Sequence, residues 1–199
     1  GLNLTAEVRD GILRHSKGKG NVLMKGSGEK AFTLEAEVVR LADIIAYVNH
    51  DLDDAVRGGL LLEEDVPAEI RRTLGPGHSQ RFATLIHDVI TASDVEGGGH
   101  IVMSDAVHQA LLALRDFLYA RVYENPVVQE EFRKAQRILR DLFGWCAEDG
   151  PRLAARFEVV PREGEPLLRA VTDFISGMTD RFALATWDDI FRPRPWAIV

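Results

Sequence analysis

Residues 33–57 read TLEAEVVRLADIIAYVNHDLDDAVR, and their pattern predicts the central helix of the chain. At 100° per residue its apolar side chains fall on one side of a single helix, which predicts an amphipathic α-helix packed on a core. These side chains are Leu41, Ile44, Ile45, Val48, Leu52, Ala55 and Val56.

The opposite side of this helix carries polar groups that packing does not require. Asp43, Tyr47 and Asp51 follow one another every four residues, within an arc of about 80° and over about 12 Å of helix axis. His50 and Asp54 share this side, and we call the five residues the acidic strip. Like charges at this spacing repel, so the strip is either a solvated face or is compensated by a cation or polar ligand. The Tyr47 ring favours the second alternative, because an aromatic ring can stack on a bound ligand.

Helical signals continue along the whole chain. Strand alternation and internal repeats are not evident. Thr5 is expected to cap a first helix to about His15, and a Gly-rich loop over 16–32 follows. The other expected helices are a short one after Pro67 and segments over 79–92, 105–123, 126–145 and 166–185. The glycines at 97–99 predict a hinge or linker.

Two His-Asp dipeptides, His50-Asp51 and His87-Asp88, suggest a metal site together with His15. Adjacent residues on a helix point about 100° apart, so such a dipeptide binds one ion only where special geometry brings both side chains to it. We therefore interpret His87, Asp88 and His15 as structural residues, with His15 at a helix end where a cation suits the carbonyl groups.

Composition limits the class of protein. The chain has 199 residues, 46% of them hydrophobic, which is enough for one sizeable core. The single cysteine, Cys146, excludes an internal disulfide and indicates a reducing compartment, so we expect a cytoplasmic protein. A net charge of −7 argues against a general nucleic-acid surface. No apolar run approaches the roughly 18 residues of a membrane span.

Several of these segments together resemble one known family. Residues 33–57 resemble the last metal-ligand helix of the HD-domain phosphohydrolases, in particular the bacterial deoxyguanosine triphosphate triphosphohydrolase-like (dGTPase-like) family, whose pattern there is TLEA..V..LAD.IAY..HD..DA. Three more segments resemble that family: GLNLTAEVRDGILRHS at 1–16, LRDFLYARVYENPVVQEEFRKAQRILRDLF at 114–143 and DFISGMTDRFAL at 173–184. The resemblance covers nearly the whole chain.

This resemblance implies roles for four residues. Asp43 falls on the Asp that completes the family's H…HD…D set of ligands for a divalent metal ion such as Mg²⁺ or Mn²⁺. Tyr47 and Asp51 fall on positions that in related enzymes stack on and hydrogen-bond the deoxyribose. Arg121 falls near an arginine that contacts the triphosphate. From the helix alone, an arginine beside the apolar Phe117 is a structural residue that keeps its charge in solvent.

The resemblance also implies the fold and the reaction. We expect an all-α, HD-domain-like multi-helix bundle that lacks the N-terminal helices carrying the H and HD ligands. Residues 1–96 would form the C-terminal part of the HD core, and 97–199 a C-terminal helical subdomain. The parent reaction is attack of a metal-activated water on the α-phosphorus of a deoxynucleoside triphosphate, which gives deoxynucleoside and triphosphate.

Two expectations concern this chain by itself. It is expected to be inactive alone and not to hold the metal ion, because one exposed carboxylate is a weak ligand that fixes no geometry. Apolar surface left without its packing partners predicts a homo-oligomer. The alternative function is a non-catalytic helical module for oligomerisation or nucleotide sensing, in which the acidic strip is only a solvated surface.

Overall fold

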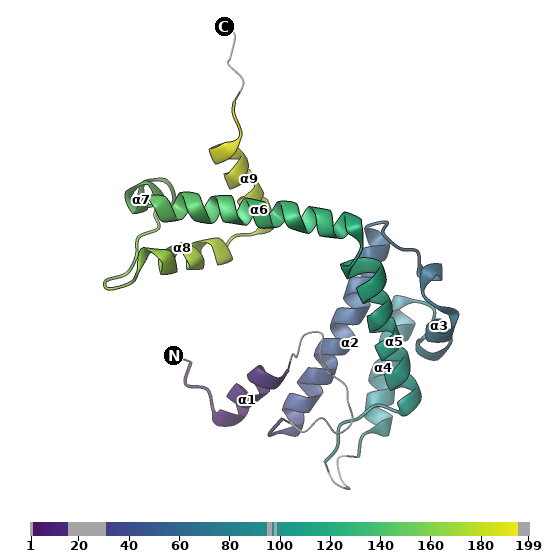
Figure 1. Cartoon of the computed structure of the whole chain (residues 1–199). Helices are drawn as coiled ribbons and strands as arrows, with labels where there is room; N and C mark the ends of the chain where they lie inside the picture. The colour runs from purple at the N-terminus through teal and green to yellow at the C-terminus, as the bar shows by residue number, and fades with distance from the viewer. Residues whose placement is uncertain (1, 16–30, 95–96, 98, 195–199) are drawn as a thin grey trace. The chain divides into compact units, whose positions relative to one another are not determined.

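The computed structural model describes residues 2–15, 31–94, 97 and 99–194 (Figure 1). By their internal contacts they divide into two compact units, Gly1–Asn125 and Pro126–Val199, which we call the N-terminal and C-terminal units. Every regular element in these ranges is helical, and the one β interaction there is an isolated antiparallel bridge between Asp94 and His100. The prediction of an all-α protein is confirmed.

The N-terminal unit is built around α2, Leu34–Arg57, the helix expected over 33–57. Thr33 begins it, because its side chain accepts a hydrogen bond from the Ala36 N–H at 3.3 Å. The predicted helical phase is confirmed: six of the seven apolar side chains are buried and Val56 is half-buried. Burial of this face, at about 1.5–3 kcal/mol for each large side chain, is the main term that holds α2 in place.

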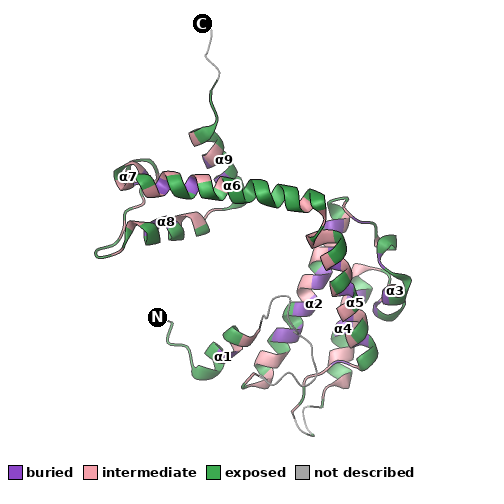
Figure 2. Cartoon of the chain, viewed as in Figure 1, coloured by how far each residue is buried: buried purple, intermediate pink, exposed green. Residues whose placement is uncertain are grey.

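Other helices of the N-terminal unit pack around α2. They are α1 (Ala6–Arg14), the short 3₁₀ helix η1 (Glu63–Asp65), α3 (Ala68–Leu74), α4 (His78–Ala92), α5 (Asp105–Leu118) and the π-helical turn η2 (Tyr119–Tyr123). Helices α4 and α5 both contact α2, and α3 contacts α4 and α5. Their fully buried leucines, Leu74, Leu85, Leu111, Leu114 and Leu118, share one core with the apolar face of α2 (Figure 2).

A buried arginine joins three of these elements. The Arg81 side chain on α4 is 0% exposed and donates to both carboxylate oxygens of Glu63, at 2.9 and 3.4 Å. Its Nε also donates to Asn49 Oδ1 at 3.4 Å, and Asn49 in turn donates to the Ile45 carbonyl at 2.7 Å. A buried charge is tolerated only where it is paired in this way. The network fixes α2 against α4 and η1.

Helix α1 docks on the start of α2 through a close contact and a buried carboxylate. A Cβ on Gly11 would stand 3.2 Å from the Ala36 Cβ, so glycine permits this approach. Asp10 accepts from Arg14 Nε at 2.6 Å and from the Phe32 N–H at 2.8 Å. Burial alone would raise the pKa of Asp10, but these hydrogen bonds outweigh it and hold the pKa below its ordinary value.

The C-terminal unit, as far as Arg194, contains four helices: α6 (Pro126–Glu148), α7 (Gly150–Phe157), α8 (Leu167–Ser176) and α9 (Asp180–Phe191). Helix α6 contacts each of the other three. Cys146, Leu153 and Val171 are fully buried at its centre, with aromatic rings such as Trp145 and Phe174 packed against them. Trp187 Nε1 donates to Asp141 Oδ2 at 2.9 Å and so ties α9 to α6.

The expected single helix over 166–185 is wrong. Helix α8 ends at Ser176 with Gly177 as its C-cap, and α9 begins after Thr179, whose side chain accepts from the Phe182 N–H at 3.3 Å. The two local capping signals override an apolar periodicity that runs through both helices. Helix α7 was not expected from the sequence.

The compact units do not divide where the sequence suggested a subdomain boundary. The expected division lies at 96/97, whereas the contacts divide the chain at 125/126, because α5 packs on α2 and α3 in the N-terminal core. The subdomain boundary at 96/97 therefore stays a prediction from the sequence. Most of the loop expected over 16–32 lies outside the described residues.

Candidate functional site

The acidic strip lies at the edge of the core, and the Tyr47 ring packs against the buried side chains there. Asp43 is exposed, and Tyr47 and Asp51 are half-buried, whereas Ile44 and Val48 on the other side are buried. The Asp43 carboxylate is therefore available to groups outside the apolar core, and that of Asp51 is partly so. The helical phase predicts the surroundings of Asp43 correctly, but Tyr47 packs against the core as well.

A second element meets the strip at Asp51. The hydroxyl of Tyr123, in η2, donates a short hydrogen bond to Asp51 Oδ2 across 72 positions of sequence. Tyr119 lies one turn earlier, and its ring stands edge-on to Tyr123 with centroids 4.9 Å apart. With Tyr47, these are all three tyrosines of the chain. We call Tyr47, Asp51, Tyr119 and Tyr123 the tyrosine cluster.

Electrostatic shifts show that the cluster is a single environment. Burial raises the pKa of Tyr47 above its ordinary value, and Tyr119 adds to the rise. The positive charge of Arg115 opposes this rise in pKa, while the carboxylates of Asp51 and Asp43 reinforce it. Burial also raises the pKa of Tyr123, and the hydrogen bond to Asp51 raises it further. Both phenols therefore stay protonated beyond the pH at which an ordinary tyrosine ionises, and Tyr123 donates to Asp51.

The π-helical turn explains how Tyr123 reaches α2. The Glu124 N–H donates to the Tyr119 carbonyl at 2.9 Å, a bond five residues back along the chain. Such a turn re-aims the side chains that follow it, and π-turns occur often at functional sites. The apolar periodicity predicts an ordinary helix through Tyr123 and does not point to Tyr119, Tyr123 or Arg115 as site residues. The only signal available was the repeat of aromatic and basic residues in LRDFLYARVY.

Arg121 lies on the same turn but makes a different contact. Its side chain is exposed and its guanidinium lies over the Phe117 ring, 5.9 Å from the centroid. Within the described part of the chain, no contact of Arg121 with Asp43, Tyr47 or Asp51 is observed. Arg115 is the arginine whose charge acts on Tyr47, and its side chain, 18% exposed, also pairs with Asp116 at 3.2 Å.

The histidines considered as metal ligands lie apart. The His50 ring stacks on His78 of α4, with centroids 6.3 Å apart and planes at 11°, and both rings contact Phe82. Asp88 Oδ2 accepts at 2.8 Å from the N–H of Ser104, which is the N-cap of α5, and this contact is a structural one. Within the described ranges, no three His, Cys, Asp or Glu side chains are grouped closely enough to hold a metal ion.

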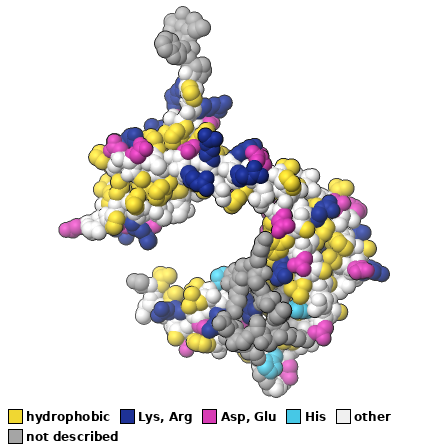
Figure 3. Space-filling view, viewed as in Figure 1, with side chains coloured by type: hydrophobic (Ala, Val, Ile, Leu, Met, Phe, Trp, Pro, Cys, Tyr) yellow, Lys and Arg dark blue, Asp and Glu magenta, His cyan; other side chains and the backbone are white. Residues whose placement is uncertain are grey.

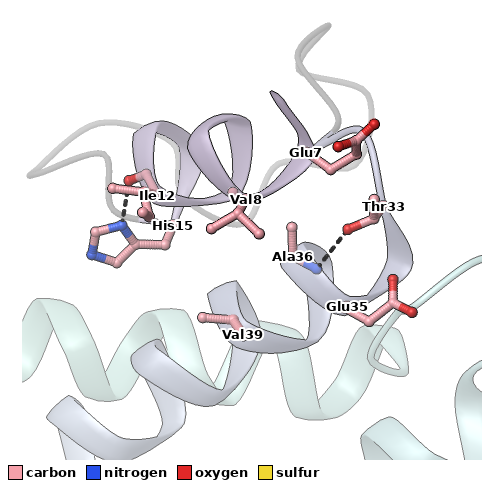
Figure 4. A pocket seen from close by; sticks show the side chains of 9 residues that line it. Glu7, Val8, Ile12, His15, Thr33, Glu35, Ala36 and Val39 are labelled. Carbon is pink, nitrogen blue, oxygen red and sulfur yellow. Dashed lines mark hydrogen bonds between the residues drawn. The ribbon is translucent and has the colours of Figure 1, made fainter. Parts of the chain in front are cut away.

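A groove opens between α1 and α2, on the same side of α2 as Asp43. It has a volume of about 680 Å³, and Val8, Ile12 and Val39 give it a mainly apolar wall (Figure 4). His15 stands at its edge, where its Nδ1 donates to the Ile12 carbonyl at 2.7 Å. Val39 and Asp43 are four residues apart on α2, so the groove ends about one turn before Asp43.

Comparison with known proteins gives one consistent family. Residues 101–189 match the family described as "Phosphohydrolase-associated domain". The chain is similar to deoxyguanosinetriphosphate triphosphohydrolase-like proteins of Desulfatibacillum aliphaticivorans, at 46% identity over 98% of this chain and 57% of the relative. It is also similar to those of Clostridium tetani, at 41% identity and 55% of the relative, and Caldanaerobacter subterraneus, at 40% and 54%. The chain thus spans somewhat over half the length of these relatives.

Of the described helices, none is both long enough and apolar enough to cross a membrane.

Proposed function

Because this chain belongs to the dGTPase-like family of phosphohydrolases, we propose that it forms the sugar-binding side of a deoxynucleoside triphosphate triphosphohydrolase. The enzyme would cleave its substrate to deoxynucleoside and triphosphate. The observation that carries this proposal is the pairing of Tyr123 with Asp51 beside Tyr47 on the acidic strip.

The tyrosine cluster has the chemistry that a deoxyribose requires. Tyr123 donates to Oδ2 of Asp51, which fixes the carboxylate and lets Oδ1 accept a hydrogen bond from a sugar hydroxyl. The half-buried Tyr47 ring supplies a flat apolar wall one turn away. A site of this kind rejects a ligand that lacks the matching hydroxyl, because its own buried polar groups are then left without hydrogen-bond partners.

The family's divalent metal ion would meet this chain at Asp43. When bound, such an ion activates water and neutralises phosphate charge. Asp43 is an exposed carboxylate on the strip, and the described residues offer it no second and third ligand nearby. The chain would therefore supply one ligand of the set. The other ligands would lie in a region that corresponds to the part of the relatives outside the matched residues.

Arginines of α5 and η2 would bind the phosphate groups of the substrate. Arg121 is exposed and keeps its guanidinium available, as the resemblance implies for a triphosphate contact. Arg115 is a second candidate, because its charge reaches Tyr47 within the cluster. One guanidinium group can donate to two phosphate oxygens at once, so either arginine has the chemistry that a triphosphate contact needs.

A longer version of the protein, extended to the length of the relatives, tests this proposal, and we call it the extended version. Asp51→Asn and Tyr47→Ala should each reduce kcat/KM for deoxyguanosine triphosphate by at least about tenfold, with Mn²⁺ present and triphosphate as the measured product. Asp54→Asn is the matched control, since Asp54 is an exposed member of the same strip, and its activity should stay within about twofold. Release of pyrophosphate, or equal effects of all three variants, would contradict the proposal.

The second candidate is a non-catalytic helical module for oligomerisation or nucleotide sensing. It is favoured by the long exposed part of α6. Nucleotide binding without turnover in the extended version would favour it. We also propose that the protein is cytoplasmic and self-associates.

A further inference from the structure

The π-helical turn η2 holds a surplus residue compared with an ordinary helical turn. The Glu124 N–H donates to the Tyr119 carbonyl at 2.9 Å, whereas an α-helix would give that carbonyl to the N–H of Tyr123. Rewinding η2 to an α-helix would move the residues at its end by about one position, or roughly 100° around the helix axis. Tyr123 is one of these residues, so its hydroxyl meets Asp51 only in the π-helical form.

Rewinding would exchange hydrogen bonds of the turn and leave α5 in place. The Tyr119 carbonyl has a backbone donor in both forms. The Arg121 carbonyl accepts from the Asn125 side chain at 3.3 Å, and in an α-helix it would accept from the Asn125 backbone N–H instead. Pro126 follows and has no N–H, so the hydrogen-bond ladder of this helix ends before it. The two forms therefore differ little in backbone hydrogen bonding.

The contacts of Tyr123 decide between the two forms. A π-helical turn is rare in proteins, so without tertiary contacts this segment would be α-helical. Tyr123 donates to the Asp51 carboxylate, and a hydrogen bond to a charged acceptor is roughly twice as strong as one between neutral groups. Its ring also packs against the core and stands edge-on to Tyr119. Loss of the bond to Asp51 therefore favours the α-helical form.

We propose that η2 exchanges between a π-helical and an α-helical form and thereby gates the tyrosine cluster, an inference that rests on the proposed function for the identity of the ligand. In the π-helical form Tyr123 fixes the Asp51 carboxylate and covers one of its oxygens. In the α-helical form Tyr123 withdraws and uncovers the half-buried Asp51. A deoxynucleoside enters in the second form and is held in the first, so its binding shifts the exchange toward the π-helical form.

Nuclear magnetic resonance of the 199-residue chain, with its tyrosines labelled with ¹³C at Cζ, tests the exchange. Tyr123→Phe identifies the Tyr123 signal. Rotation of a tyrosine ring about its own axis does not move Cζ, so relaxation dispersion of this signal reports a change of environment over microseconds to milliseconds. We expect dispersion in the unmodified chain, with an amplitude at least about twofold larger in Asp51→Asn, which weakens the hydrogen bond. A flat profile for Tyr123 in both proteins would overturn the proposal.

Deletion of Ala120 distinguishes this exchange from fraying of the helix end. The deletion removes the surplus residue, so an ordinary α-helix then brings Tyr123 close to the place where the π-helical turn puts it. The dispersion of the Tyr123 signal should disappear. Ala120→Ser is the matched control, because it changes the same exposed position without shortening the chain, and it should keep the dispersion. Dispersion that persists unchanged after the deletion would mean a general loosening of the helix end and would overturn the proposal.

The probe for the gate is 2′-deoxyguanosine, which carries no net charge. Acidic and basic side chains are interspersed on the face drawn in Figure 3, so a charged probe could also bind elsewhere on the surface. Saturation with the nucleoside should reduce the dispersion at Tyr123 at least about threefold. Unchanged dispersion, although the Tyr47 signal shifts on binding, would overturn the gate. Absence of binding would contradict the proposed sugar site and the gate with it, whereas the Ala120 and Asp51 variants decide the exchange by themselves.

Discussion

The Tyr123 hydroxyl donates a hydrogen bond to the Asp51 carboxylate and so joins the π-helical turn η2 to the acidic strip of α2. The hydrogen bond spans 72 positions of sequence, so it is a contact of the tertiary structure and not of a single helix. A sugar-binding role for Asp51 depends on it, because it fixes one carboxylate oxygen and thereby aims the other.

Removing either partner should impair the same function. In the extended version, Tyr123→Phe should lower kcat/KM for deoxynucleoside triphosphates about tenfold, mainly through KM, since a hydrogen bond to a charged group is worth about 1.5–3 kcal/mol. Combining it with Asp51→Asn should add little to the loss from Asp51→Asn alone. Steady-state kinetics of the three variants gives this double-mutant cycle. Fully additive losses would show that the two residues act separately.

The tyrosine titration should report the same contact. Tyr47 and Tyr123 both have raised pKa values, so their ionisation, followed by near-ultraviolet absorbance, should begin above the ordinary value of about 10. The stabilisation that these two protonated phenols give the folded state is then complete below about pH 10. It is lost as the pH rises through their folded-state pKa values. Asp51→Asn should bring the pKa of Tyr123 down, because it removes both the acceptor charge and its repulsion of a phenolate. Asp54→Asn should leave the titration unchanged.

Local patterns predicted most of the fold, because helix phase and caps are properties of neighbouring residues. The 3.6-residue period gave the buried face of α2, and Thr5, Thr33 and Ser104 begin helices through their side chains. The break between α8 and α9 was also marked locally, by Gly177 and Thr179, but the continuous apolar pattern outweighed these signals.

The candidate site was predictable only on one element. Helix phase placed Asp43, Tyr47 and Asp51 on one side of α2, because spacing of four residues is a local property. The partner of Asp51 is 72 residues away, and its π-turn depends on how α5 packs on α2. No pattern within LRDFLYARVY specifies that contact. For the same reason the sequence did not indicate that Arg81 is buried and bridges Asn49 to Glu63.

Arg81 should be among the residues most important for stability in the N-terminal unit. Arg81→Ala leaves Asn49 Oδ1 buried without its donor, removes the ion pair with Glu63 and creates a cavity, at a cost of about 3 kcal/mol. Urea unfolding followed by circular dichroism measures the change. Arg72→Ala, an exposed arginine on α3, should cost less than about 0.5 kcal/mol. Similar losses from both variants would mean that the network adds nothing beyond an ordinary surface arginine.

The last prediction is that this chain alone does not hydrolyse deoxynucleoside triphosphates. Asp43 is one exposed carboxylate, and a single oxygen ligand holds Mg²⁺ or Mn²⁺ weakly and without the geometry that water activation needs. Triphosphate release measured with either ion should not exceed the rate without protein, whereas deoxynucleoside binding through the tyrosine cluster can persist. Turnover within about tenfold of the extended version, abolished by Asp43→Ala, would contradict this prediction. It would require a ligand set drawn from His15, His50 and Asp51, yet the His50 ring packs on His78 and Phe82 while Asp51 faces Tyr123, so α2 would have to reorganise to bring them to one ion.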